Sequence, residues 1–320
     1  DGPSGNGPDL FAFVHDTLSS AVSNDLIAPN MYHQETKASH LEESVKAFTY
    51  QNILYGYPIT SESITLMYDK SKLSENDVSS MENLLATGQK VVWDVANTDS
   101  SAYYAFGVMN DVNLFGNGTQ ANQLNLATPK ALANMTALST TYKNMITNAT
   151  PDSALTIMQA GEAAAVISSP YLWSSVKAQL GNNAGIATLP TINGDAQRPF
   201  SGYKGYGVSR YSKNPHIAHA FASYLVGETA QRYRFIQKGI LPTYAISDII
   251  NTQVNNDAVA NVFKASLAQS LTMPNIIAMG SFWAPMNDAV SEIYNLGNTA
   301  TSNAVNTILT NATNTIKTNI

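Results

Sequence analysis

Short apolar runs bounded by polar turns predict a series of buried strands along this chain. Residues 10–14 are apolar and lie between Gly-Pro-Asp and His-Asp, which is typical of a strand that ends in a loop. Apolar side chains alternate with their neighbours after Tyr57, and this spacing predicts one extended segment over residues 57–69. Residues 90–95 and 163–167 are expected to form two further strands.

Helix signals lie between these strands. Asp152 is a candidate cap for a helix that stops at Gly161, and Asn214-Pro215 introduces another helix after a strand at residues 205–208. The apolar side of that second helix is expected to carry Ala218, Phe221, Ala222 and Leu225. Strand and helix therefore alternate, which predicts an α/β fold with mostly parallel sheets covered by helices.

Composition favours a protein of two domains. The 320 residues exceed the usual size of a single core, and 44% of them are hydrophobic. The net charge of −6, with 17 scattered Lys and Arg residues, disfavours nucleic acid as a partner. The chain has no cysteine, which excludes disulfides and thiolate metal sites. No apolar run reaches the roughly 18 residues of a membrane-spanning helix.

Metal and phosphate chemistry find little support in the sequence. The five histidines show no spacing typical of a metal site, so neither a metal nor a cofactor is expected. The glycine-rich opening segment, residues 2–7, lacks the Gly-Lys-Ser/Thr ending of a phosphate-binding loop. We therefore interpret that segment as a plain loop.

Four short segments pair an aromatic ring or a carboxylate with a sharp turn: residues 7–16, 57–62, 168–173 and 273–283. Aromatic rings pack against the faces of sugars, and carboxylates accept hydrogen bonds from hydroxyl groups. Together these side chains are what a carbohydrate-binding cleft needs.

In their order and amino-acid sequence, these segments resemble those of the maltose/maltodextrin-binding proteins, which are extracytoplasmic solute receptors of ABC importers. The resemblance runs from about Gly7 to the C-terminus and includes residues 158–165 and 185–190. It implies a two-lobed periplasmic-binding-protein-like fold (type II) in which the chain crosses three times between lobes. The implied parts are a smaller, incomplete N-terminal lobe (1–60 plus 206–252), a larger C-terminal lobe (66–200 plus 258–320) and hinges near 60–65, 200–206 and 252–259.

The resembled family carries a further strand-helix-strand unit before the Gly-Pro-Asp motif, whereas this sequence starts at Asp1. We therefore expect a truncated chain, or a complementing segment elsewhere, and an incomplete smaller lobe.

Resemblance also implies the ligand-binding aromatic residues. Phe13, Tyr171 and Trp283 occupy the positions of the family's sugar-stacking rings, two of which are usually tryptophan in the places of Phe13 and Tyr171. Tyr103 or Tyr104 corresponds to a ring that closes over the sugar from the larger lobe. The alternative for each is an ordinary core position, which a lone aromatic residue at strand spacing usually occupies.

Asp16 and Glu62 match the carboxylates with which the family accepts sugar hydroxyls, through charge-assisted hydrogen bonds. Asp16 could instead cap the following helix, in competition with Thr17 and Ser19. Glu62 could instead be a solvated hinge residue, although a carboxylate within an apolar alternation has no obvious structural use.

Three charged residues of the family pattern are replaced here. A glutamate appears as Ser101, and two arginines appear as Thr17 and Asn287, which leaves the identity of the sugar open. Lys204 could make a cation–π contact with a neighbouring tyrosine or extend along the sheet to water.

Trp93 and Trp173 match no sugar-contacting position and are expected in the core.

The sequence therefore predicts a receptor without catalytic activity that binds maltose or maltodextrin and delivers it, by hinge closure, to the membrane permease of an ABC importer. It is expected to be a monomer when complete, at the cell surface with a lipid anchor in a Gram-positive bacterium, or in the periplasm. The alternatives are a glycoside hydrolase that uses Asp16 and Glu62, and a receptor for a non-glucose glycan.

Overall fold

The computed structural model describes Ser4, residues 6–97 and residues 99–320, and the chain divides into two compact units. Unit 1 comprises Asp1–Glu62, Gly202–Asn261 and Met273–Gly280; unit 2 comprises Ser63–Ser201, Val262–Thr272 and Ser281–Ile320. Residues 2, 3 and 5 of the opening segment that we interpret as a loop lie outside the described residues.

The chain passes between the two units more often than the resemblance implies. The chain changes unit after Glu62, Ser201 and Asn261, and residues 273–280 return to unit 1. The resemblance places the whole of 258–320 in the larger lobe. The roles of 60–65, 200–206 and 252–259 as hinges stay predictions.

Unit 1 is built on a sheet that includes β1 (Leu10–Val14) and β10 (Phe200–Val208), which pair antiparallel with Phe13 opposite Gly205. β4 (Tyr57–Ser63) also pairs with β10. The strand predicted at residues 10–14 is therefore present. The other elements of this unit are α1 (Leu18–Ser23), α2 (His33–Ser39), α3 (Glu42–Ala47), β2 (Thr49–Tyr50), β3 (Ile53–Leu54), α10 (Pro215–Val226), α11 (Glu228–Lys238) and α12 (Asp248–Asn256).

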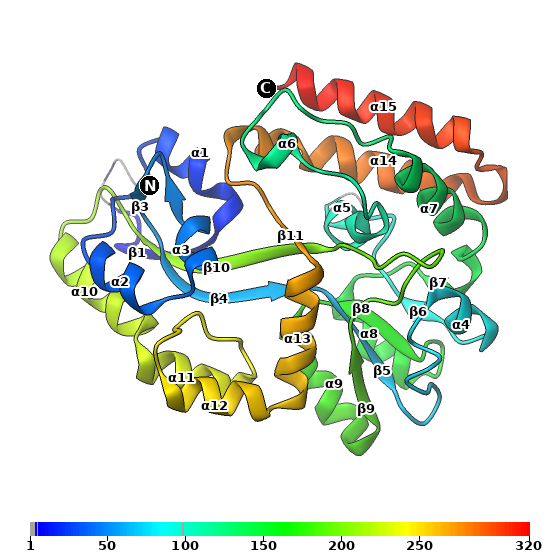
Figure 1. Ribbon diagram of the computed structural model, residues 1–320, viewed down its shortest axis with the longest axis horizontal. Helices are drawn as coiled ribbons and strands as arrows, with labels where there is room; N and C mark the ends of the chain where they lie inside the picture. The colour runs from blue at the N-terminus through cyan, green and yellow to red at the C-terminus, as the bar shows by residue number, and fades with distance from the viewer. Residues whose placement is uncertain (1–3, 5, 98) are drawn as a thin grey trace. The chain divides into compact units, whose positions relative to one another are not determined.

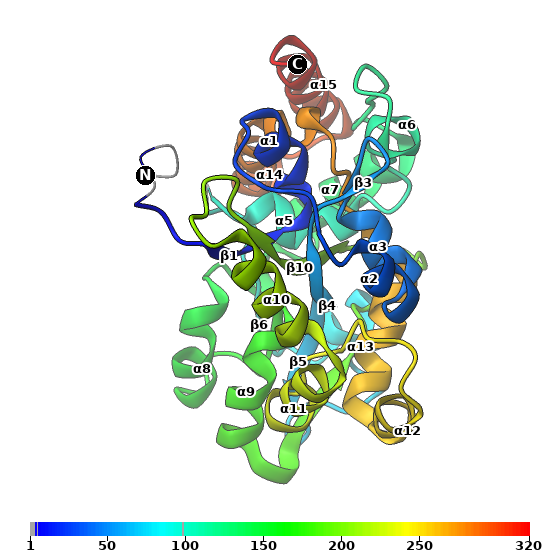
Figure 2. The same ribbon diagram turned by 90° about the vertical axis from the view of Figure 1, so that its left-hand side faces the viewer.

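Apolar clusters cover both faces of the β10 strand. Val208 packs with Ala218 and Ala222 where α10 covers the sheet (Figure 2). On another face, Phe48 packs so closely that a Cβ atom on Gly205 would lie 2.5 Å from its ring. The predicted apolar side of α10 is wrong for Phe221, which is 53% exposed, because Ala218 and Ala222, one turn apart, already face the sheet.

Unit 2 contains a sheet with the strand order β7-β6-β8-β5-β9 (Figure 1). β5 pairs antiparallel with β8 and β9, whereas β6 pairs parallel with β7 and β8. The sheets are therefore mixed rather than mostly parallel, because β5 continues the long segment that enters from β4. The bounds of these strands are β5 (Thr65–Asp69), β6 (Val91–Val92), β7 (Ile146–Thr147), β8 (Ala165–Ser168) and β9 (Ala184–Ala187).

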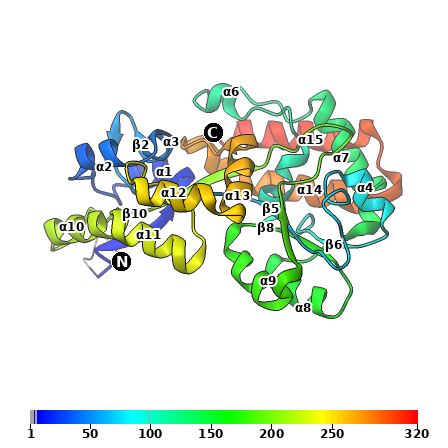
Figure 3. The ribbon, with the colours of Figure 1, turned by 60° about the horizontal axis from the view of Figure 1, so that its bottom comes forward.

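Three helices, α7 (Pro129–Thr140), α14 (Trp283–Leu296) and α15 (Ser302–Thr318), lie side by side in unit 2 (Figures 1 and 3). α15 buries Val305, Ile308, Leu309, Ala312 and Ile316, a spacing that forms one apolar stripe. The remaining elements are α4 (Met81–Ala86), α5 (Ser101–Ala105), α6 (Phe115–Gly118), α8 (Pro151–Gln159), α9 (Trp173–Leu180), β11 (Leu271–Thr272) and α13 (Ala258–Gln269), which begins in unit 1.

Two local predictions need correction. The strand expected over 90–95 shrinks to β6, because the backbone N–H of Val95 donates to the Asn148 side chain instead of a strand partner. The helix expected after Asp152 begins at Pro151 with Thr150 in the cap position, since the fixed φ of proline suits the first helical residue. Asp152 lies in the first turn.

Within the described residues, no helix combines the length and apolar character that crossing a membrane would require.

Candidate functional site

The end of β1 carries two of the predicted ligand residues in unit 1. Phe13 is half-buried and its ring packs edge-on against Phe48 at 5.2 Å between centroids. Asp16 lies in the 3-10 helix His15–Thr17 that follows the strand, and it is also half-buried. The cap position of α1 belongs to Thr17, whose hydroxyl donates to the Val14 carbonyl, so Asp16 is not the cap of that helix.

His15, next to Asp16, is a fully buried and neutral group. The backbone N–H of Tyr203 donates to His15 Nδ1 over 3.1 Å, so the ring proton lies on Nε2, which donates to the Met273 carbonyl oxygen over 2.8 Å. Burial lowers the pKa of His15 from 6.5 to about 4. This histidine therefore links β1 to β10 and to the segment that starts at Met273, a role that no local sequence pattern predicts.

Glu62 forms an ion pair with Lys204 in unit 1. Lys204 Nζ lies 2.7 Å from Glu62 Oε1, and the Glu62 side chain is 15% exposed. The interpretation of Glu62 as a solvated residue is therefore wrong. Lys204 is thus held by a carboxylate, and the cation over the Tyr206 ring is Arg234, whose guanidinium carbon lies 5.9 Å from the ring centroid.

A cluster of rings in unit 2 contains Tyr103 and Trp283. Both approach Phe200, at centroid distances of 6.4 Å for Tyr103 and 5.6 Å for Trp283. Phe282 packs edge-on against Trp283 at 5.3 Å, and Phe106 stacks on Phe200 at 3.9 Å. Trp283 is half-buried, whereas Phe200 and Phe282 are completely buried. Trp283 and Tyr103 thus pack against buried phenylalanines. The sequence patterns did not predict this supporting role, although Phe282 directly precedes Trp283.

Tyr171 and Tyr104 occupy different environments in unit 2. Tyr171 is 51% exposed, and its hydroxyl donates to Asp152 Oδ1 over 3.1 Å. Tyr104 is buried, and this burial, followed by the charge of neighbouring groups, raises the pKa of its hydroxyl above the ordinary value. Tyr171 is thus an accessible ring held by a carboxylate, whereas Tyr104 belongs to the packed interior.

Two positions where the resembled family carries charges contact each other here. Ser101 and Asn287 are both buried, and the Ser101 hydroxyl donates to the backbone carbonyl oxygen of Asn287 over 3.2 Å. Asn287 Oδ1 also accepts from the backbone N–H of Ala102 over 2.8 Å. These bonds join α5, which carries Tyr103, to α14, which begins at Trp283.

The two tryptophans assigned to the core differ. Trp93 is completely buried, and its indole N–H donates to the Tyr104 carbonyl oxygen over 3.0 Å, as expected for a core residue with a polar handle. Trp173 starts α9 and is half-buried, so its assignment to the core is too strong.

The structure therefore groups the predicted residues by unit. Phe13, Asp16 and Glu62 belong to unit 1, and Tyr103, Tyr104, Tyr171 and Trp283 belong to unit 2. The described residues contain no cluster of three or more His, Cys, Asp or Glu side chains suited to a metal ion. Rings, carboxylates and an ammonium group can bind a polyhydroxylated ligand by stacking and hydrogen bonding.

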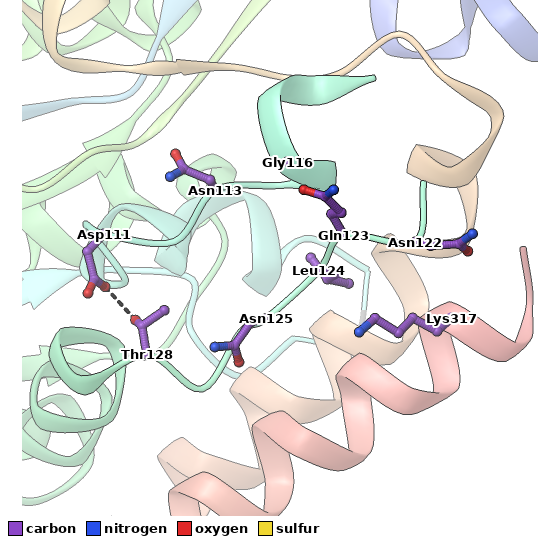
Figure 4. Close-up of a pocket in the computed structure, with 9 residues that line it drawn as sticks. All are labelled: Asp111, Asn113, Gly116, Asn122, Gln123, Leu124, Asn125, Thr128 and Lys317. Carbon is purple, nitrogen blue, oxygen red and sulfur yellow. Dashed lines mark hydrogen bonds between the residues drawn. The ribbon is translucent and has the colours of Figure 1, made fainter. Parts of the chain in front are cut away.

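A polar pocket of about 400 Å³ lies elsewhere in unit 2 and contains none of the seven predicted residues. Figure 4 shows side chains from the segment around α6 and Lys317 from α15 around it, with Thr128 donating to Asp111. Amide groups dominate its lining, through Asn113, Asn122, Gln123 and Asn125.

Comparison with known proteins gives consistent matches over most of the chain. The family described as bacterial extracellular solute-binding protein matches residues 1–277. A galactooligosaccharide-binding protein of Bacillus subtilis (strain 168) is 25% identical over 313 residues, covering 92% of this chain and 73% of that protein. The maltodextrin-binding protein MdxE of the same organism is 26% identical over 310 residues, covering 88% of this chain and 72% of that protein.

Solved structures show the same fold. The crystal structure of a cyclo/maltodextrin-binding protein complexed with maltotetraose has a TM-score of 0.79 and 27% identity, and the match covers 100% of this chain and 84% of that one. This similarity confirms the predicted α/β, two-lobed periplasmic-binding-protein-like fold class. The family match spans most of the 320 residues, and the chain therefore belongs to the bacterial extracellular solute-binding proteins.

Proposed function

We propose that this chain is an extracytoplasmic receptor for maltose or maltodextrin that serves the permease of an ABC importer. The observation that carries the proposal is the ring cluster of Tyr103 and Trp283, which rests on the buried Phe200. Half-buried rings on a rigid apolar base can stack on sugar faces without first being ordered. A relative that binds maltodextrin and a structural neighbour that holds maltotetraose support the choice of sugar.

The charged groups of unit 1 complement these rings in the proposal. Asp16 and Glu62 accept hydrogen bonds from sugar hydroxyls, and Phe13 adds a ring near the end of β1. Ligand binding is coupled to hinge closure in this proposal, because a ligand shifts the equilibrium between open and closed states when its interactions differ between them.

Titration of the purified chain with maltotriose in a calorimeter tests the proposal. All three tryptophans belong to unit 2, so a change in tryptophan fluorescence gives a second readout near Trp283. Saturable binding with micromolar or tighter affinity is expected. Heat and fluorescence that stay flat with maltose, maltotriose and maltotetraose would refute the choice of maltodextrin.

A galacto-oligosaccharide is the second candidate ligand, because a relative covering 92% of this chain bears that name. The replacement of charged family residues by Ser101 and Asn287 also leaves room for a different sugar. Side-by-side titrations with maltotriose and a galactotriose separate the two candidates, since the tighter ligand identifies the sugar class.

Catalysis is not part of the proposal. Glycoside hydrolysis requires one of two carboxyl groups to donate a proton, whereas Glu62 is held in an ion pair with Lys204. The family is one of binding proteins. Incubation with labelled maltodextrin is expected to leave its length unchanged, and shorter products would reinstate the hydrolase alternative.

The cellular setting completes the proposal. The chain acts outside the cytoplasm as a monomer, held at the surface by a lipid anchor or free in a periplasm. Fractionation of the native host followed by detection with an antibody tests the location. Recovery of the protein in the cytoplasmic fraction would contradict it.

A further inference from the structure

The Glu62–Lys204 ion pair joins two strands of the sheet in unit 1. Lys204 lies on β10, directly opposite Val14 of β1, and β10 also pairs with β4, which carries Glu62. Lys204 is therefore fixed by the same sheet that positions Glu62 and leads to Asp16.

Exposure of the two side chains is unequal. The Glu62 side chain is 15% exposed and the Lys204 side chain 44%. A carboxylate with so little contact with water needs a cation or several donors beside it, because burying an unpaired charge is costly. At 2.7 Å, the ammonium group of Lys204 makes a charge-assisted hydrogen bond of ordinary length.

The pair retains capacity for a ligand. A carboxylate has about four lone-pair sites on its two oxygens, and an ammonium group has three donors. The contact with Lys204 uses Glu62 Oε1. One hydroxyl of a sugar can therefore donate to the carboxylate while a neighbouring hydroxyl accepts from the ammonium group. A neutral ligand whose hydroxyls both donate and accept can use both charged groups.

We propose that Lys204 is a positioning and specificity-determining residue of the carbohydrate site, which orients the Glu62 carboxylate and favours a neutral glycan. The proposal rests on the proposed function, because it assigns Glu62 to the ligand. Lys204 acts mainly through Glu62, so its contribution depends on the presence of that carboxylate.

A double-mutant cycle with calorimetry tests this dependence. Lys204→Met is expected to weaken binding of maltotriose, or of the galactotriose if that binds more tightly, about tenfold, equivalent to about 1.4 kcal/mol. Lys204→Arg should restore affinity to within about threefold, because it keeps a cation that can pair with Glu62. In the Glu62→Gln background, Lys204→Met should weaken binding less than about twofold.

Lys213 provides the matched control, since it is an exposed lysine of the same unit beyond the end of β10. Lys213→Met should bind like the unmodified chain, and melting temperatures without ligand show that each variant is folded. Normal binding by Lys204→Met, or an equal loss with and without the Glu62 carboxylate, would overturn the positioning role while leaving the receptor function intact. An unmodified chain that binds neither sugar would refute the proposed function and this inference with it.

Discussion

Acid should destabilise unit 1 selectively, because all five histidines of the chain belong to it and two are buried with strongly lowered pKa values. Burial lowers the pKa of both His15 and His40 from 6.5 to about 4. Between about pH 4 and about pH 6.5, each of these two histidines binds a proton in the unfolded chain but not in the folded chain. The free energy of unfolding must therefore fall as the pH drops from about 6.5 to about 4.

The magnitude follows from the size of the shift. A change of one pKa unit is worth about 1.4 kcal/mol, so each histidine contributes at most about 3 kcal/mol of stability that acid removes. At about pH 5 only part of this stability is lost. Each histidine should there have lowered the free energy of unfolding by about 2 kcal/mol relative to neutral pH. The stability is fully present above about pH 6.5 and is lost as the pH approaches about 4.

Replacing His15 by Gln tests this reasoning. The amide can still donate toward Met273 but cannot take up a proton in this pH range. Denaturant unfolding followed by circular dichroism should show that His15→Gln loses about 2 kcal/mol less than the unmodified chain between about pH 7.5 and pH 5. Tryptophan fluorescence in the same samples reports on unit 2, which holds all three tryptophans.

Exposed His33 offers the control, and His33→Gln should keep the pH dependence of the unmodified chain. Equal losses of stability in His15→Gln and the unmodified chain would refute the reasoning. So would an acid-induced transition that appears first in the tryptophan signal, because that signal comes from unit 2.

Three further substitutions probe unit 2. Trp283→Ala should weaken maltotriose binding by about 1–3 kcal/mol in calorimetry, the scale of one buried aromatic contact, and unchanged affinity would show Trp283 to be structural. Asn287→Leu should lower the free energy of unfolding by about 1–3 kcal/mol, because the backbone N–H of Ala102 loses its acceptor; an unaltered denaturation midpoint would argue against this bridge. Tyr171→Phe should bind more tightly than Tyr171→Ala, since it keeps the ring and loses only the hydroxyl group, which donates to Asp152, and equal affinities would remove the stacking role.

Patterns within a short stretch of sequence predicted much of the framework. The apolar run at residues 10–14 forms β1, and the alternation after Tyr57 forms β4 and β5, interrupted at Ile64. Such patterns report which faces are buried. They failed where a side chain distant in sequence intervened, as when Asn148 ends the ladder of β6.

The partners of the candidate residues lay beyond sequence reasoning for the same reason. Glu62 and Lys204 are far apart in sequence and meet because their strands pair, so their ion pair depends on the register of the sheet. Phe200 falls in the hinge that the resemblance implies near 200–206 and before the strand predicted at 205–208, whereas β10 starts at Phe200 itself. Once β10 is known to start at Phe200, this ring becomes a candidate for supporting the aromatic residues of the site.

The bond between Ser101 and Asn287 changes what the lost family charges mean. From sequence, each replacement counted as a missing hydrogen-bonding group for the sugar. In the structure the Ser101 hydroxyl donates to the backbone carbonyl oxygen of Asn287, and the Asn287 side chain accepts from the backbone N–H of Ala102, so the helices that carry Tyr103 and Trp283 are joined by neutral groups. A neutral link suits this place, because a charge buried behind the rings would need a partner of its own. The rings of Tyr103 and Trp283 are supplied by unit 2 and the Glu62–Lys204 pair by unit 1.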